Sequence, residues 1–420
     1  MNPAANQELK VEIDRLRLVI QCSPLPEDDY KHHIHLKKAQ LIPSADSSEA
    51  LSLLIDYYMG LSAGGRNNVA REALRTHWTY VLLRLSGCQL QGKWLVVSLT
   101  KGDYAKKEGW LRHYRLSLGA VRTVVGCLEQ RGDIERLQGK KYAQEPSRTR
   151  LFPTGQLAPQ LWQFYLDMEE PIEPPYITMN KPDDIYQNII PKLAKDHPEI
   201  VELEEINDFL RDHQWARKGP IVMKYKHTPF QSGRLYTPFQ ELPDRRARVR
   251  INTLIDGQPI CEVDFSANHL RMNLALLSDE FAGTSPYEDI VDLVVGADRA
   301  MVKNFITKAM GASNRVEAAS SCRLEGMTAA TFDSIEAATR NRFPKLQLFI
   351  GWGLSAQNLE GAILRNVMLQ GARLGIVVLP VHDAVAVQQQ HAEWAMTAMQ
   401  AAWKKEIGTD VDTLVKVDYP

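Results

Sequence analysis

The chain has 420 residues, a formal net charge of −1, 44% hydrophobic and 24% charged residues, which is ordinary for a soluble globular protein of about two or three domains. Its five cysteines are scattered without a CxxC pair, a usage that excludes a disulfide framework and a zinc ribbon and favours a reducing compartment. The polar first residues and the lack of a long apolar run argue against a signal peptide and a membrane span. We therefore expect a cytoplasmic protein without a membrane partner, while its oligomeric state stays open.

The N-terminal part, residues 1–72, is predicted to be a helical region. Residues 8–21 and 46–62 have the spacing of apolar residues that is typical of amphipathic helices. The segment HHIH contains His32, His33 and His35 and resembles a metal-binding cluster. No carboxylate or cysteine lies at a suitable spacing to complete it, so we do not expect a metal site there.

Residues 73–165 have the element order of a small DNA-binding module. HWTYVLLRL predicts a helix, KWLVVSL a strand, and the segment from Gly109 a helical region that ends at Gly132, followed by a hairpin over IERLQGKKY and SRTRLFP. A helix followed by a basic hairpin resembles the winged-helix variant of the helix-turn-helix. Modules of this kind also serve as protein-interaction scaffolds, so contact with DNA is one of two open interpretations.

The same region is a local island of positive charge. Residues 101–150 hold 12 Lys or Arg against 6 Asp or Glu. A solvated surface is the simplest explanation of such a charge run, but a folded module that presents it to a duplex would bind phosphates. The expected phosphate contacts of this DNA-binding module are Arg112, Arg115, Arg122, Lys140 and Lys141.

Residues 166–250 are rich in proline and charge, with a helical stretch at IVELEEINDFLRD. We expect this segment to be a thumb-like bridge into a C-terminal domain, residues 251–420. That domain begins with PICEVDFSANHLRMNLALLSD, a short apolar strand that reaches Asp264 and continues as a helix. An acid at the end of a strand can hold a divalent ion through its carboxylate and the adjacent backbone carbonyl.

Two further segments complete a candidate site. DRAMVKNFITKAMG places Arg299 and Lys303 one helical turn apart, which suits a triphosphate, and LPVHDAVAV carries His382 and Asp383 on a predicted β-hairpin. An ionised Asp among apolar residues is unfavourable unless something such as a metal ion pairs with it. Two separated acids with a cationic helix between them are what two-metal nucleotidyl transfer requires. Taken singly, each residue has a simpler explanation: a helix N-cap, a solvated face or a satisfied core histidine.

In order and local sequence these segments resemble motifs A, B and C of family A DNA polymerases, the polymerase I type. Asp264, Phe265, Ser266, Leu270 and Arg271 fill motif A positions, Arg299, Lys303 and Gly311 fit motif B, and His382 and Asp383 fit motif C. GRLYTPFQ, with Arg234, resembles the upstream segment that lies near the primer–template in that family. The resemblance covers about residues 225–420 and rests on the three motifs in order.

The chain departs from the family at several of these positions. The motif A Glu, which blocks the ribose 2′-position in the family, is His269, the motif B Tyr is Met310, and the Glu after the motif C Asp is Ala384. The fingers region is short, and we find no acid motifs of a proofreading exonuclease. Phage-type RNA polymerases share the palm and also lack the Glu after motif C.

The resemblance implies an α+β fold: a right-hand polymerase palm with reduced fingers, preceded by the N-terminal helical and winged-helix-like region. It implies DNA synthesis in replication from nucleoside triphosphates on a DNA primer–template with two Mg²⁺ ions, or Mn²⁺. Asp264 and Asp383 would be catalytic and bind the metals with the Phe265 carbonyl. The nucleotide contacts would be Arg299, Lys303, His269 and Met310, and the primer–template contacts Arg234, Arg271 and His382. The alternatives are RNA polymerase or primase-like activity, and a non-catalytic replication initiator or regulator with a decayed palm.

Overall fold

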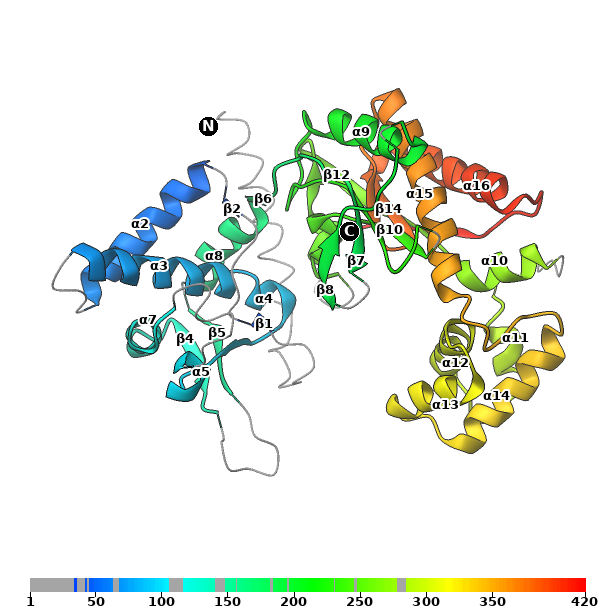
Figure 1. Cartoon of the computed structure of the whole chain (residues 1–420), viewed down its shortest axis with the longest axis horizontal. Helices are drawn as coiled ribbons and strands as arrows, with labels where there is room; N and C mark the ends of the chain where they lie inside the picture. The colour runs from blue at the N-terminus through cyan, green and yellow to red at the C-terminus, as the bar shows by residue number, and fades with distance from the viewer. Residues whose placement is uncertain are drawn as a thin grey trace. The chain divides into compact units, whose positions relative to one another are not determined.

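The computed structural model describes residues 34–35, 42–43, 45–62, 68–105, 116–139, 148–155, 157–181, 184–194, 196–229, 231–244, 248–277 and 285–420. These residues form a mixture of helices and strands (Figure 1) in two compact units. Unit 1 comprises Met1–Pro171, Gln214–Gly219 and Glu241–Gly257, and unit 2 comprises Ile172–His213, Pro220–Gln240 and Gln258–Pro420. The four-part functional division of the chain stays a prediction.

Unit 1 packs helices around a small sheet. Its helices are α2 (Ala45–Leu61), α3 (Asn68–Leu85), α4 (Cys88–Gln91), α5 (Lys101–Ala105), α7 (Leu118–Gln130) and α8 (Leu157–Leu166). Its strands are β1 (Ile34–His35), β2 (Ile42–Pro43), β3 (Leu95–Val97), β4 (Ile134–Leu137), β5 (Thr149–Pro153), β6 (Met168–Glu169) and β11 (Leu254–Ile255). The sheet order is β1-β3-β5-β4, with β2 paired to β6. Its core buries Trp78, Leu82 and Leu95 almost completely.

Several elements predicted in unit 1 are confirmed. Helix α7 buries Val121, Val125 and Leu128 and leaves Arg122 exposed, as the apolar spacing predicts. The Ser117 side chain caps its start by accepting from the Ala120 N–H, and the positive φ of Gly132 follows its end. Strands β4 and β5 pair antiparallel as the predicted hairpin. The identification as a winged helix stays a prediction.

Unit 2 contains two sheets. Its strands are β7 (Ile177–Lys181), β8 (Asp184–Ile189), β9 (Val222–Tyr225), β10 (Ser232–Tyr236), β12 (Gln258–Phe265), β13 (Leu379–Val381), β14 (Ala384–Gln388) and β15 (Val415–Asp418). One sheet has the order β10-β9-β7-β8. In the other, which carries the acids predicted from the sequence, β15, β12, β14 and β13 are antiparallel neighbours in that order.

Helices cover these sheets and form a separate helical lobe in unit 2 (Figure 1). They are α9 (Pro198–Leu210), α10 (Asn268–Leu276), α11 (Glu288–Val291), α12 (Arg299–Gly311), α13 (Arg315–Leu324), α14 (Ala329–Arg342), α15 (Gly353–Leu374) and α16 (Ala392–Ile407), with a 3₁₀ helix at Gln389–His391. The lobe consists of α11 to α14, whose core includes Phe305, Phe332 and Ile335. Side-chain caps by Asp298 and Asn314 fix the starts of α12 and α13.

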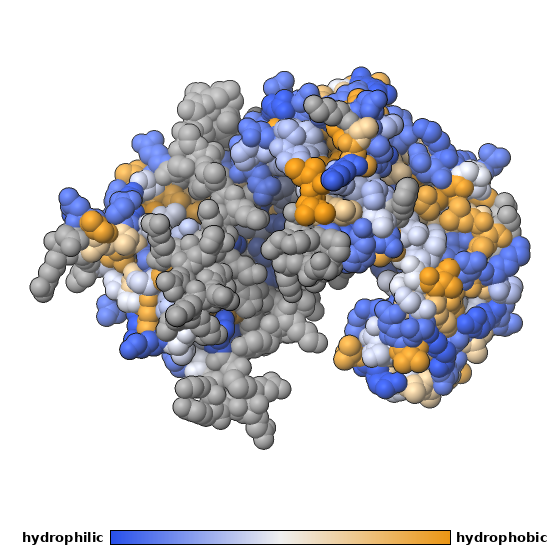
Figure 2. All heavy atoms as spheres, in the orientation of Figure 1, coloured by the Kyte–Doolittle hydropathy of each residue, from blue (hydrophilic) through white to orange (hydrophobic). Residues whose placement is uncertain are grey.

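The long helix α15 connects the lobe to the sheets, because it packs against β10, α9 and α16 and its first turns lie near α12. Among the residues coloured by hydropathy in Figure 2, most on the visible face are hydrophilic, and the hydrophobic ones lie in separate patches. Among the helices that the structure describes, none has the length and apolar character needed to cross a membrane.

Candidate active site

The two acids predicted from the sequence lie together at one end of the second sheet. Asp264 is the penultimate residue of β12 and pairs with Ala384, the first residue of β14. Val381 pairs with Ala384 across the β13–β14 hairpin, so His382 and Asp383 form its two-residue turn. Directly opposed Cα atoms in an antiparallel pair are about 4.5–5.5 Å apart. Asp383 is therefore one residue away from a direct cross-strand neighbour of Asp264.

The turn requires an unusual backbone conformation at His382, whose φ is 59°. Two-residue hairpins favour positive φ values because these match the twist of the strands. Histidine is among the few residues other than glycine that are enriched in this region. The dipeptide HD is thus a turn between two apolar strands, which carries Asp383 to the end of the sheet and leaves His382 exposed.

The protein environment disfavours negative charge on both acids. Burial by the surrounding protein, and then the charge of the Asp383 carboxylate, raise the pKa of Asp264 to about 7 against the opposing effect of Lys303. Asp264 still reaches solvent, so its pKa is raised by partial loss of hydration and not by enclosure. Burial, and then the charge of Glu360, likewise raise the pKa of Asp383. A cation bound between the two carboxylates would relieve their repulsion.

The two α12 cations predicted for the site, Arg299 and Lys303, have different surroundings. Lys303 is exposed, and its charge acts on Asp264, which places it beside the acid pair. Arg299 lies at the start of the helix, where its Nε is 2.8 Å from Glu288 Oε1 and its guanidinium is 5.3 Å from the ring centre of Tyr287. Lys303 is therefore the α12 cation that faces the acids, while Arg299 is held by an ion pair.

Tyr287 is a site residue that the sequence did not indicate. It is 6% exposed, and burial raises the pKa of its phenol to about 12. The charges that act on it include Arg299, Asp383 and Arg271. Its hydroxyl group therefore belongs to the surroundings of the acid pair, although it lies well outside the strand and helix that the motifs identify.

A buried carboxylate, Glu360, joins two of the predicted residues. Glu360 is 1% exposed on α15. Arg234 donates to both of its oxygens, at 2.7 Å from Nε to Oε1 and 3.2 Å from Nη2 to Oε2. The Nε2 of His269 is 2.8 Å from the same Oε2. Glu360, His269 and Arg234 all act electrostatically on Asp383, so this triad borders the acid pair.

Close backbone packing explains how the triad is assembled. In β10 the register shifts between Ser232 and Arg234, and this bulge aims the Arg234 side chain toward α15. A Cβ added at Gly361 would overlap the carbonyl oxygen of Gly233. A Cβ at Gly233 would lie 2.9 Å from the Asn358 Nδ2. Two glycines therefore let α15 approach β10 closely enough for Glu360 to reach Arg234.

Other residues predicted for the site have different positions. Met310 is 3% exposed in the core of the helical lobe, so its position does not support a nucleotide contact. Arg271 is 5% exposed and its Nε donates to the Ser266 carbonyl 3.0 Å away, so it supports the turn between β12 and α10, and its contact with a primer–template stays a prediction. The Phe265 side chain is also buried.

The predicted DNA-binding residues of unit 1 are only partly described. Arg122 is exposed on α7 and its Nη2 donates to the Leu99 carbonyl. The predicted contacts that lie outside the described residues are Arg112, Arg115, Lys140 and Lys141. The HHIH segment also lies outside them, except for the backbone of Ile34 and His35 in β1.

Asp264 and Asp383 would be a minimal set of metal ligands. Among the residues whose positions the structure describes, no group of three or more His, Cys, Asp or Glu side chains could hold a metal. Mg²⁺ is commonly bound by one or two carboxylates together with water and substrate phosphates. Two neighbouring carboxylates with raised pKa values fit such a substrate-completed ion, and they do not fit a site closed by protein ligands alone.

The raised pKa of Asp264 predicts a stability gain for Asp264→Asn without metal. The folded pKa of about 7 exceeds the unfolded value of about 3.9. Between these values the native state binds a proton that the unfolded state lacks, so native stability falls as the pH rises. The variant has no charge to bury, and its gain in Tm over the wild type should grow from pH 4 to pH 7.5. Thermal unfolding in a chelator measures this, and a constant or shrinking gain would contradict it.

Comparisons with known proteins add little to this geometry. No family model and no curated protein sequence matches the chain. Among solved structures, the polymerase domain of Pol1 from M. smegmatis, in complex with DNA primer-template and dNTP, matches with a TM-score of 0.30 and 12% sequence identity, over 98% of this chain and 69% of that chain. At this degree of likeness the match identifies neither a fold nor an activity.

Proposed function

We propose that this chain catalyses template-directed nucleotidyl transfer and synthesises DNA from nucleoside triphosphates on a primer–template. The observation that carries the proposal is the acid pair: Asp264 and Asp383 meet at one end of a sheet, and Lys303 lies beside them. Paired acids suit divalent ions, and a neighbouring cation suits phosphates. The three residues come from three segments in the order of the family A polymerase motifs.

In this proposal the protein residues have distinct tasks. Asp264 and Asp383, with the Phe265 carbonyl, hold two Mg²⁺ or Mn²⁺ ions. When bound, such ions activate an attacking 3′-hydroxyl and neutralise the leaving pyrophosphate. Lys303 attracts and orients the triphosphate, and Arg299 joins it when a phosphate replaces Glu288 as its partner. His269 lies against the sugar, and Arg234 and His382 lie toward the primer–template.

The same proposal assigns architecture to the two units. The sheet of β15, β12, β14 and β13 with its covering helices is a polymerase palm, and the lobe of α11 to α14 is a reduced fingers region. In unit 1, the helices and the β4–β5 hairpin form a winged-helix-like module that holds duplex through the basic residues of the 101–150 island. This assignment is supported by element order and by the placement of the acids.

Primer extension tests the proposal directly. Purified protein is incubated with an end-labelled primer–template, Mg²⁺ or Mn²⁺, and each of the eight nucleotides. We expect addition of the nucleotide that complements the template, dependence on a divalent ion, and a change of the added nucleotide when the template base is changed. The Asp383→Asn protein, purified in the same way, is the control for a contaminating polymerase, because a contaminant would extend the primer in both preparations.

The outcomes separate the proposed function from its rivals. Better extension with ribonucleotides would assign the chain to RNA polymerases or primases. Duplex binding without incorporation under either metal would favour a non-catalytic replication initiator or regulator. The lack of a carboxylate at Ala384, directly opposite Asp264, is the feature that this second outcome would explain.

A further inference from the structure

Glu360 is a negative charge placed where the protein has little water to hydrate it. Both of its oxygens are used: Oε1 accepts from Arg234 Nε at 2.7 Å, and Oε2 is 2.8 Å from His269 Nε2. A buried carboxylate is tolerated when its charge is matched and its oxygens are hydrogen-bonded. Arg234 supplies the matching charge, so His269 is required by hydrogen bonding and not by charge balance.

The partner of Nε2 decides which edge of the His269 ring remains available. An ionised carboxylate only accepts hydrogen bonds, so Nε2 must carry the proton in its contact with Glu360. The Nδ1 edge then faces away from Glu360 and has no hydrogen-bond partner among the described residues. This edge is the part of the ring that can meet a ligand.

The ring is also supported on another side. Its centre is 6.4 Å from that of Trp352, with the planes at 81° in an edge-to-face arrangement. Trp352 comes at the start of α15, where Gly353 packs closely on Gly311 of α12. A histidine that is bonded at Nε2 and braced by an indole ring has little freedom to turn away from a ligand.

We propose that Glu360 is a positioning residue that fixes His269 as a rigid wall of the sugar pocket, so that a ribose 2′-hydroxyl is excluded. The inference rests on the proposed function and names its sugar specificity. A loose imidazole would rotate and admit the extra hydroxyl, whereas a pinned ring cannot. Exclusion by shape therefore depends on Glu360, which itself does not touch the nucleotide.

Glu360→Gln is the informative substitution, because it keeps the shape of the side chain and removes one acceptor. The amide has a single acceptor oxygen, so it cannot serve both Arg234 and His269 as the carboxylate does. Arg234 is the stronger donor and is expected to retain the oxygen, which leaves the ring without its anchor. The selectivity for deoxynucleotides over ribonucleotides, as a ratio of kcat/KM values, should then fall about tenfold, within the range of one lost discriminating contact.

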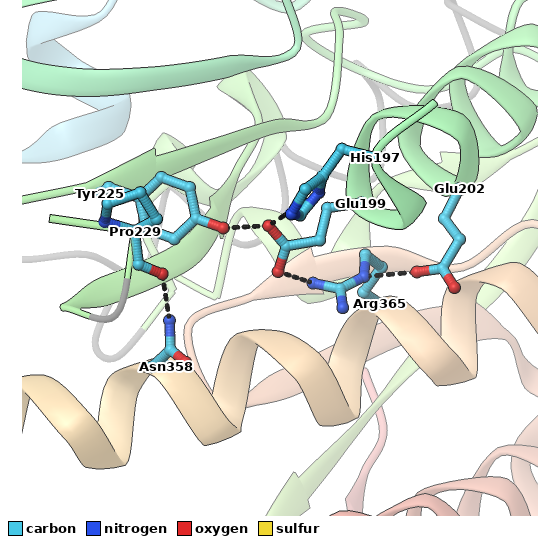
Figure 3. A network of polar contacts seen from close by, with 7 residues as sticks. All are labelled: His197, Glu199, Glu202, Tyr225, Pro229, Asn358 and Arg365. Carbon is cyan, nitrogen blue, oxygen red and sulfur yellow. Dashed lines mark hydrogen bonds and ion pairs between the residues drawn. The ribbon is translucent and has the colours of Figure 1, made fainter. Parts of the chain in front are cut away.

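A second set of polar contacts made by α15, away from His269, provides a control. Five residues beyond Glu360, Arg365 of α15 donates to Glu199 Oε1 at 3.0 Å and to Glu202 Oε2 at 2.6 Å, both on α9 (Figure 3). Glu199 also accepts from the Tyr225 hydroxyl. Glu199→Gln weakens the attachment of α15 without changing the partners of His269. Its sugar selectivity should equal that of the wild type.

The decisive measurement is a double-mutant cycle with His269→Ala, which by itself should reduce selectivity about 10- to 200-fold. If Glu360 acts on the sugar only through the ring, Glu360→Gln will reduce selectivity in the wild type and have no effect in the His269→Ala protein. A general structural defect would instead lower kcat/KM for deoxynucleotides and ribonucleotides alike, and this loss would be the same with or without the His269 side chain. If Glu360→Gln does not fold, Glu360→Asp takes its place in the cycle. It retains both acceptor oxygens, but on a shorter side chain.

The failures of the two proposals are distinguishable. Wild-type protein that extends primers, together with unchanged selectivity in Glu360→Gln, overturns the role of Glu360 and leaves the proposed function standing. An equal loss of selectivity in Glu199→Gln also overturns it, because the effect would then come from loosening α15. If the wild type adds no nucleotide of either kind, the proposed function and the inference that rests on it both fall.

Discussion

Asp264→Asn and Asp383→Asn are each expected to lower primer extension about 10³-fold or more, for deoxynucleotides and ribonucleotides alike. Asparagine keeps the size of the side chain and removes the negative charge that binds a divalent ion. The metal pair in such sites supplies several kcal/mol of transition-state stabilisation, and about 4 kcal/mol corresponds to about 10³-fold in rate. Single-turnover extension at saturating nucleotide measures the effect on the chemical step.

Glu262→Gln is the matched control for these two substitutions. Glu262 is two residues before Asp264 on β12, is largely buried, and lies on the same face of the sheet because strand side chains alternate. We expect the extension rate of Glu262→Gln to stay within about tenfold of the wild type. Glu262 pairs with Ala386, two residues further from the turn than Ala384, so it contributes less to a metal held by Asp383. Comparable losses of extension rate in all three variants would mean that activity requires negative charge anywhere on this face of the sheet, and would contradict a site formed by two acids.

Local sequence patterns were sufficient to predict the strands that carry the two acids, whereas the pairing of the acids was predicted from the three motifs taken in order. The short apolar run before Asp264, and the two apolar segments on either side of His382 and Asp383, define strand ends from adjacent residues alone. Both strands are present, and their register places the acids together. Such features are predictable because the residues that cause them are neighbours in sequence.

Glu360 and Tyr287 could not be found in the same way. Glu360 lies in a mixed polar helix, and its meaning depends on Arg234, which is 126 positions away. The only local signal was Gly361, which follows it and allows contact with β10. Tyr287 precedes a short helix and acquires its surroundings from Arg299 and Asp383. These roles come from long-range packing, which no motif in one sequence encodes.

Helix α12 shows where helical periodicity gives incomplete information. Arg299, Lys303, Ile306 and Met310 follow one face by spacing, as predicted. In the structure the first two are exposed, whereas Ile306 and Met310 are 1% and 3% exposed in the lobe core. This face is thus divided along its length, because the lobe core covers Ile306 and Met310 but not Arg299 and Lys303. Spacing indicates which residues share a face and not what covers each turn.

The glycine contact between α15 and β10 leads to the largest expected effect on stability. Gly361→Ala adds a Cβ that would overlap the Gly233 carbonyl oxygen and lie 2.9 Å from its carbon. Both partners are backbone atoms in regular elements, so neither can rotate away. Overpacking of this kind destabilises by about 3 kcal/mol, the upper end of its usual range. Separation of α15 from β10 would also move Glu360 away from Arg234, so the sugar selectivity should fall together with the stability.

Gly126→Ala is the same substitution in an unobstructed helix and should have the opposite sign. Gly126 lies in the middle of α7, and no atom lies within 4 Å of an added Cβ. Alanine is favoured over glycine in a helix interior by about 1 kcal/mol, so this variant should be more stable than the wild type. Denaturant unfolding of both variants provides the comparison, with far-UV circular dichroism to follow the helices. A Gly361→Ala protein as stable as Gly126→Ala would show that α15 and β10 do not pack through their glycines, and the arrangement of Glu360 beside Arg234 and His269 would lose its structural basis.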